Sequence, residues 1–166
     1  MKRKLYVAVL GMSLLTACSI PKADAPEWFE NAVKTSNSQL LYMAEKLKDV
    51  PDTACFPRST KPDGSYRLEN GKDWTSGFYP GSMWLAYELT GDEALAEEAR
   101  KYTNRLEDIQ YYTGNHDIGF MMYCSYGNAL RLKPEPKDKE ILINSSESLC
   151  ARFSPEIGLI RSWDFG

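Results

Sequence analysis

Segments with helical hydrophobic periodicity follow one another along most of the 166 residues. In each, apolar side chains recur every three or four positions, which is the spacing of one face of an α-helix. The expected helices cover residues 26–48, 80–90, 92–109, 118–130 and 137–153. They alternate between amphipathic helices, which face water on one side, and apolar helices, which need cover all round. The sequence therefore predicts an all-α fold of helical hairpins stacked in an inner and an outer layer.

Turn-forming residues mark the ends of these segments. Pro80 begins the second helix and Gly91 follows it, which is the asymmetry typical of helix starts and ends. Residues 51–72 are rich in turn signals and predict a long loop with room for a short hairpin. Residues 159–164 are expected to be extended. Structureless loops longer than ~12–15 residues are uncommon in compact domains, so 51–72 is a candidate functional segment.

The N-terminus resembles a bacterial lipoprotein signal. Three basic residues at positions 2–4 precede an apolar run, residues 5–15, that is too short to span a bilayer stably. Cys18 stands where such signals place the cysteine that becomes lipidated. We therefore expect residues 1–17 to be a removable signal and 18–25 a lipid-anchored tether in the bacterial cell envelope, on its periplasmic or cell-surface side. The alternative is an ordinary secretory signal with an incidental cysteine.

The charge balance and the cysteines bear on several classes of partner. Removing residues 1–17, which carry three positive charges and no negative one, lowers the formal net charge from −3 to −6. Nucleic-acid binding needs clustered Lys and Arg, so this acidic chain is not expected to bind nucleic acid. One histidine and no Cys/His cluster argue against a zinc site, and no cofactor is expected. Three further cysteines allow at most one disulfide among them: Cys55, Cys124 and Cys150.

The single histidine, His116, stands beside Asp117 between a glycine turn and the start of an apolar helix. A carboxylate at a loop-to-helix junction is well placed for chemistry, because the loop exposes it and the helix N-terminus favours its charged form. Aspartate is also an ordinary helix cap, so the pattern alone leaves both interpretations of Asp117 open.

Four motifs in series resemble glycoside hydrolase family 88, the unsaturated glucuronyl hydrolases. The resemblance extends from about residue 26 to residue 166. The motifs are Asp-Trp-Thr-Ser-Gly-Phe-Tyr-Pro-Gly at 73–81, the run from Trp84 to Asp92, His-Asp-Ile-Gly-Phe at 116–120 and Arg-Ser-Trp-Asp at 161–164.

The resemblance implies an (α/α)6 barrel, which needs roughly twice the residues of this chain. Residues 26–166 would thus be the N-terminal portion of the catalytic domain, about the first half of the barrel. We expect that portion alone to be inactive. The implied substrates are oligosaccharides left by polysaccharide lyases, which carry a 4,5-unsaturated uronic acid at their non-reducing end.

The implied reaction hydrates a vinyl ether and uses a pair of aspartates. Protonation of C4 places positive charge on C5 and the ring oxygen, so a proton donor and a stabilising carboxylate are needed. The resemblance assigns the stabilising role to Asp117 and places His116 at the same pocket. The proton donor belongs to a later motif, and Asp164 does not match its position.

Tryptophans are the remaining candidates. The resemblance places Trp74 and Trp163 at aromatic positions that line the sugar-binding subsite, where the C–H face of a sugar stacks on indole. The alternative for both is a loop-anchoring role. Trp84, inside an apolar helix, is expected to belong to the core.

Two alternative functions fit the same residues. One is a related barrel enzyme that hydrates unsaturated galacturonyl groups on rhamnogalacturonan fragments. The other is a cell-surface lipoprotein that captures glycans through Trp74 and Trp163 without turnover. The sequence alone leaves the oligomeric state, the linkage and the sulfation preference open.

Overall fold

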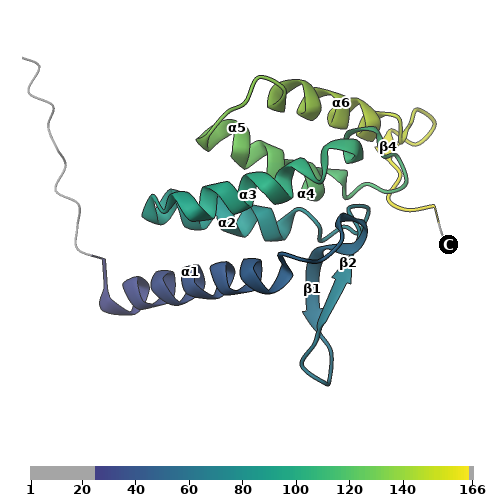
Figure 1. The fold of residues 1–166 in the computed structure, drawn as a ribbon. Coiled ribbons are helices and arrows are strands. Elements are labelled where there is room, and N and C mark those ends of the chain that lie inside the picture. Colours follow the sequence, from purple (N-terminus) through teal and green to yellow (C-terminus); the bar gives the residue numbers. More distant parts are fainter. Residues whose placement is uncertain (1–24, 165–166) are drawn as a thin grey trace, which may run out of the picture.

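A computed structural model describes residues 25–164. Its helices and strands are α1 (Glu27–Leu47), β1 (Phe56–Thr60), β2 (Tyr66–Glu69), α2 (Phe78–Thr90), α3 (Glu93–Asn104), α4 (Ile118–Met122), α5 (Asn128–Leu132), α6 (Asp138–Cys150), β3 (Phe153–Ser154) and β4 (Leu159–Ile160). Single turns of 3-10 helix lie at Asp52–Ala54 and Glu107–Tyr111, and a π-helical turn, Tyr123–Gly127, joins α4 to α5. Figure 1 shows α1, then the α2–α3 pair, then α4 to α6 as successive layers, with the β1–β2 hairpin projecting from one end.

The α2–α3 hairpin forms because the sequence supplies both helix ends. Gly91 adopts a φ of 72°, where a side chain would be strained, and its N–H closes α2 on the carbonyl of Tyr87 over 2.7 Å. Asp92 then caps α3 by accepting from the N–H of Ala94 at 3.1 Å. The two helices pack side by side, and the indole N–H of Trp84 donates to the hydroxyl of Thr103 at 3.0 Å.

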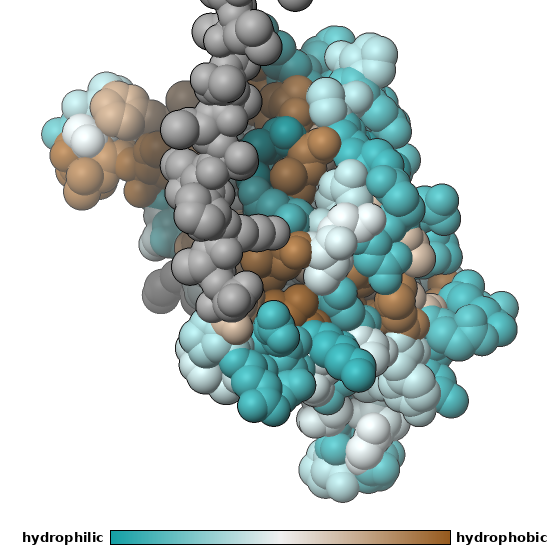
Figure 2. Space-filling view, turned by 90° about the vertical axis from the view of Figure 1, so that its left-hand side faces the viewer, coloured by the Kyte–Doolittle hydropathy of each residue, from teal (hydrophilic) through white to brown (hydrophobic). Residues whose placement is uncertain are grey.

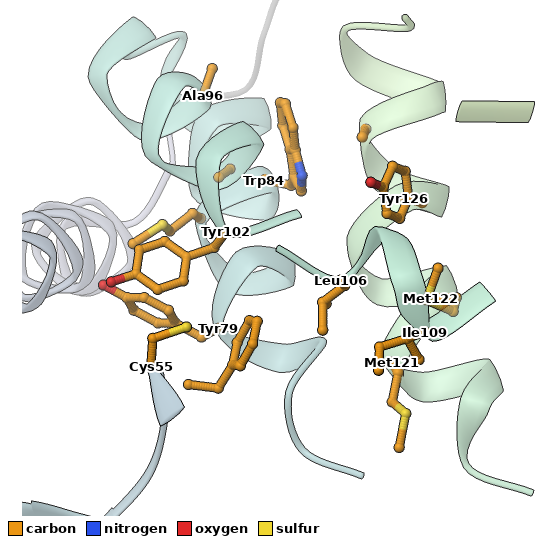
Figure 3. Close-up of a cluster of buried hydrophobic side chains, with 14 of the residues drawn as sticks. Cys55, Tyr79, Trp84, Ala96, Tyr102, Leu106, Ile109, Met121, Met122 and Tyr126 are labelled. Carbon is orange, nitrogen blue, oxygen red and sulfur yellow. The ribbon is translucent and has the colours of Figure 1, made fainter. Parts of the chain in front are cut away.

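The core lies between α2, α3 and α4 with its π-helical extension (Figure 3). Trp84 is 1% exposed, which confirms its expected core role. Tyr79 and Tyr102 meet edge to face with their ring centroids 4.8 Å apart. On the surface, hydrophobic patches remain between the polar side chains (Figure 2).

One buried ion pair fixes α6 to α3. Asp138, at the start of α6, is fully buried and accepts from Arg100 in a bidentate arrangement at 2.9 and 3.1 Å. Its second oxygen also accepts from the N–H of Glu135 at 2.8 Å. The carboxylate is therefore paired and hydrogen-bonded, as a buried charge must be.

Several expected helix boundaries are wrong. The predicted helix 118–130 is interrupted by the π-turn, where the hydroxyl of Ser125 donates to the carbonyl of Met121 at 2.6 Å. The third helix ends at Asn104 and continues as the separate 3-10 turn. The fifth ends at Cys150, before the small β3–β4 hairpin.

The structure also bears on the expected hairpin and the cysteines, but not on the N-terminal signal. Residues 56–69 contain the anticipated hairpin, so the described chain is not purely helical. Within residues 25–164 the three cysteines are free thiols, and no helix is both long and apolar enough to cross a bilayer. Cys18 and the proposed signal lie outside the described residues, so the signal, the lipid anchor and the domain boundaries stay predictions.

Candidate functional site

The candidate site is built on the turn that leads into α4. Asn115 accepts the N–H of Asp117 through its side-chain oxygen at 2.8 Å, which closes an Asx turn just before the helix. The carbonyl of Asp117 then accepts from the N–H groups of Phe120 and Met121, which begins the helix. Asp117 thus occupies the N-cap position, yet its side chain makes no capping hydrogen bond.

The carboxylate of Asp117 contacts the side chains of Trp163 and His116 and not the helix N-terminus. It is 7% exposed, and its Oδ2 accepts the indole N–H of Trp163 at 2.9 Å. Its Oδ1 lies 3.3 Å from Nε2 of His116, and the rings of His116 and Trp163 meet edge to face at 5.9 Å. The structure therefore brings three of the predicted site residues into one cluster and turns the Asp117 side chain away from the capping role.

Trp163 reaches Asp117 because the C-terminal segment pairs with the turn. Asn115 and Trp163 form an isolated antiparallel bridge, and the N–H of His116 donates to the carbonyl of Ser162 at 2.9 Å. Trp163 and Asp117 are 46 positions apart in sequence. A local reading of either motif therefore gives no sign of this contact.

A cavity of about 490 Å³ opens beside the cluster. Its walls include both predicted sugar-stacking residues, Trp74 and Trp163, which are 37% and 40% exposed. The other lining residues are mainly polar: Lys72, Asp73, Tyr112, Gly114, Asn115 and Asp164. Asp117 and His116 are not among them and adjoin the cavity through Trp163. The space suits a ring with one apolar face and several hydroxyl groups.

Trp74 is held by an aromatic cluster that sequence reasoning missed. Its ring meets Phe78 at 5.7 Å and Phe120 at 6.5 Å, and those two phenylalanines lie 5.8 Å apart. Phe120 lies in the first turn of α4, so the loop that carries Trp74 is fixed to the helix that begins at Asp117. The signal available in the sequence was the Gly-Phe-Tyr-Pro-Gly run after Trp74.

Gly77 makes this contact between loop and helix close. A Cβ at position 77 would overlap the carbonyl oxygens of Phe120 and Met121 and lie 2.8 Å from the carbonyl carbon of Met121. The backbone of the Trp74 loop thus rests directly on the backbone of α4. Only glycine fits there without movement of one segment.

Charged neighbours act on one other carboxylate of the site. Arg152 forms a two-pronged pair with Asp164 and holds the pKa of that carboxyl below its usual range. Among residues 25–164, no group of three His, Cys, Asp or Glu side chains is placed to hold a metal ion.

Comparison with known proteins identifies the family. A crystal structure of an unsaturated glucuronyl hydrolase specific for heparin superposes with a TM-score of 0.78 at 44% identity, over 86% of this chain and 37% of that one. The unsaturated glucuronyl hydrolase of Formosa agariphila is 35% identical over 99% of this chain and 42% of its own length. This chain belongs to the unsaturated glucuronyl hydrolase family. No family model matches the chain.

A second relative has both a curated sequence and a solved structure. The unsaturated glucuronyl hydrolase of Bacillus sp. strain GL1 is 30% identical over 72% of this chain and 32% of its own length. Its crystal structure superposes with a TM-score of 0.65 at 26% identity, over 80% of this chain and 36% of that one. The chain thus spans less than half the length of these relatives. The structural neighbours are six-hairpin barrels, which confirms the predicted fold class as a partial helical toroid with short strands added.

Proposed function

We propose that the protein carrying this chain hydrates the 4,5 double bond of an unsaturated uronic acid at the non-reducing end of lyase-generated oligosaccharides. One observation carries the proposal. Asp117 stands at a helix N-cap, but its carboxylate makes no capping bond and is held instead by the indole of Trp163, which lines the cavity. A buried carboxylate that does not cap its helix and lies beside a pocket is well placed to stabilise positive charge that develops in a transition state.

The residues divide the reaction as follows. A proton adds to C4, and the positive charge that develops on C5 and the ring oxygen is stabilised by Asp117. Water adds to C5 and loses a proton, and the resulting hemiketal opens and releases the neighbouring sugar. The family resemblance assigns the proton donor to a motif that follows the Ser-Trp-Asp segment. His116 lies beside the reacting ring in this proposal, because its Nε2 is 3.3 Å from Oδ1 of Asp117.

Named relatives support this class of substrate. Two streptococcal relatives that match 87% of this chain, at 26% and 28% identity, are named unsaturated chondroitin disaccharide hydrolases. A related structure that is 26% identical, with a TM-score of 0.59, is a complex with dGlcA-Glc-Rha-Glc. The shared chemistry in the proposal is the unsaturated uronic acid at the non-reducing end, with the adjoining sugar left open.

The whole protein tests the proposal on a panel of unsaturated disaccharides. The double bond is conjugated with the carboxylate and absorbs ultraviolet light, so hydration is measured as loss of this absorbance. We expect loss with glucuronyl disaccharides prepared from heparin or chondroitin. Turnover only with unsaturated rhamnogalacturonan fragments would favour the related barrel enzyme. Binding by calorimetry with no loss of absorbance on any member would contradict an enzymatic role and favour glycan capture.

Trp74→Ala is expected to raise KM about tenfold with a smaller change in kcat. The indole offers an apolar face to the sugar, and losing that contact costs on the order of 1–2 kcal/mol of binding. Trp28→Ala is the matched control, because Trp28 is 71% exposed on α1 and does not line the cavity. Steady-state kinetics of both variants give the answer. Equal KM values for Trp74→Ala and the unmodified protein would leave Trp74 as a loop anchor only.

A further inference from the structure

Arg152, which follows α6, is almost completely buried, with 2% of its surface exposed. Each of the five N–H groups of its guanidinium has an acceptor. Nε donates to the carbonyl of Arg161 at 2.9 Å, Nη2 to that of Ser162 at 3.0 Å, and Nη1 to that of Thr113. Nη1 and Nη2 also bind the Asp164 carboxylate at 3.2 and 2.9 Å.

These acceptors lie on the two chain segments that form the Asp117 cluster. Ser162 and Asp164 flank Trp163, and Thr113 belongs to the turn that ends at Asp117. The carbonyl of Ser162 accepts both from Arg152 and from the backbone N–H of His116. One side chain therefore links the backbone on either side of the hydrogen bond between Trp163 and Asp117.

Besides these bonds, the Trp163 segment is held by its backbone bridge to Asn115 and by the hydrogen bond from the N–H of His116 to the carbonyl of Ser162. Residues 155–164 are all exposed, so hydrophobic burial contributes little to their position. A buried guanidinium loses its hydration and is tolerated only when its donors are paired, so the five acceptors must stay in place together. Because their geometry is fixed by a rigid planar group, the segment has one preferred position.

We propose that Arg152 is a positioning residue of the site, which sets the indole of Trp163 against the carboxylate of Asp117 without touching the sugar. The inference rests on the proposed function for its kinetic consequence. Asp117 stabilises developing charge only if its oxygens point at the reacting ring, and the Trp163 N–H fixes one of them. Loss of Arg152 releases Trp163, and through it the orientation of Asp117.

A double-mutant cycle on the whole protein tests whether Arg152 acts on Asp117 through Trp163. Arg152→Lys keeps the charge but has a single nitrogen, which cannot serve the acceptors on both segments. It is expected to lower kcat by ~10²-fold, since a displacement of about 1 Å can cost that much. Trp163→Phe removes the indole N–H and is expected to lower kcat as well. The double variant is then no slower than the slower single one. If the double variant instead lost kcat by the product of the two single losses, the residues would act independently and the proposal would be overturned.

Two further variants serve as a control and as a substitute for Arg152→Lys. Arg131→Lys is the matched control, because Arg131 forms an exposed pair with Glu88 and neither residue lines the cavity, so the variant is expected to leave kcat unchanged. If Arg152→Lys does not fold, Asp164→Asn weakens the same clamp while leaving the three backbone bonds. Its expected loss in kcat is roughly tenfold, again with no additional loss in the Trp163→Phe background.

A measurement without substrate separates this inference from the proposed reaction. The fluorescence of Trp163 is obtained as the difference between each protein and its Trp163→Phe counterpart. Acrylamide is expected to quench that component more strongly in Arg152→Lys than in the unmodified protein, because the indole is released. If the unmodified protein turned over no disaccharide, the proposed function would fail and quenching would still decide on Arg152. Unchanged quenching would overturn the positioning role.

Discussion

Asp117→Asn is expected to lower kcat of the whole protein by about two to four orders of magnitude, with little change in KM or in the unfolding temperature. Asparagine has almost the same shape, and its side-chain oxygen can still accept the indole N–H of Trp163, which now binds Asp117 at 2.9 Å. The variant therefore keeps the geometry and removes only the negative charge. The rate loss then measures how much that charge stabilises the transition state. Ultraviolet kinetics on an unsaturated disaccharide measure it.

Asp108→Asn serves as the matched control, because Asp108 is an exposed carboxylate in the 3-10 turn Glu107–Tyr111. It is expected to react at the rate of the unmodified protein. Turnover by Asp117→Asn within tenfold of the unmodified protein would remove Asp117 from the reaction centre and leave it with the structural task of holding Trp163.

Gly77→Ala is expected to destabilise the protein by about 1–3 kcal/mol or more. The added methyl group meets the carbonyl oxygens of Phe120 and Met121, which belong to the backbone of α4 and cannot rotate away as a side chain could. Either the loop or the helix must move, and both carry site residues. Chemical denaturation measures the loss in the free energy of unfolding, and a fall in kcat/KM should accompany it.

Gly119→Ala is the matched control for stability. Gly119 lies in α4, the helix that Gly77 contacts, but a Cβ there meets no atom within 4 Å and the residue has no positive φ. Alanine favours helix over glycine by roughly 0.5–1 kcal/mol, so this variant is expected to be as stable as the unmodified protein or slightly more so. Equal stability of the two variants would contradict the close backbone contact at Gly77.

The layered helical fold could be predicted because its signals are local. The Pro80 and Gly91 boundaries of α2 follow from helix-end chemistry, and the structure places both at or near these ends. The π-turn at Tyr123–Gly127 could not be predicted, because a hydrophobic period continues through it and the distinction depends on backbone hydrogen bonds.

Part of the candidate site could also be predicted from the sequence. The His-Asp motif singled out His116 and Asp117, and the family resemblance added Trp163 through the Arg-Ser-Trp-Asp motif. The structure places the three side chains in contact. Arg152 could not be predicted, because it lies in no motif and its acceptors are brought to it only by folding. Gly77 lies within the first of the four motifs, but the reason for a glycine there is a contact with a helix more than 40 positions along the chain.

The hydrogen bond between Trp163 and Asp117 also affects the order in which the molecule opens. The segment 155–164, which carries Trp163, is exposed throughout and gains little from burial. The free energy needed to detach this segment is therefore smaller than that needed to open the α2–α3 core. Partial unfolding is then expected to separate Trp163 from Asp117 first, so that the helical core remains folded after the candidate site has come apart.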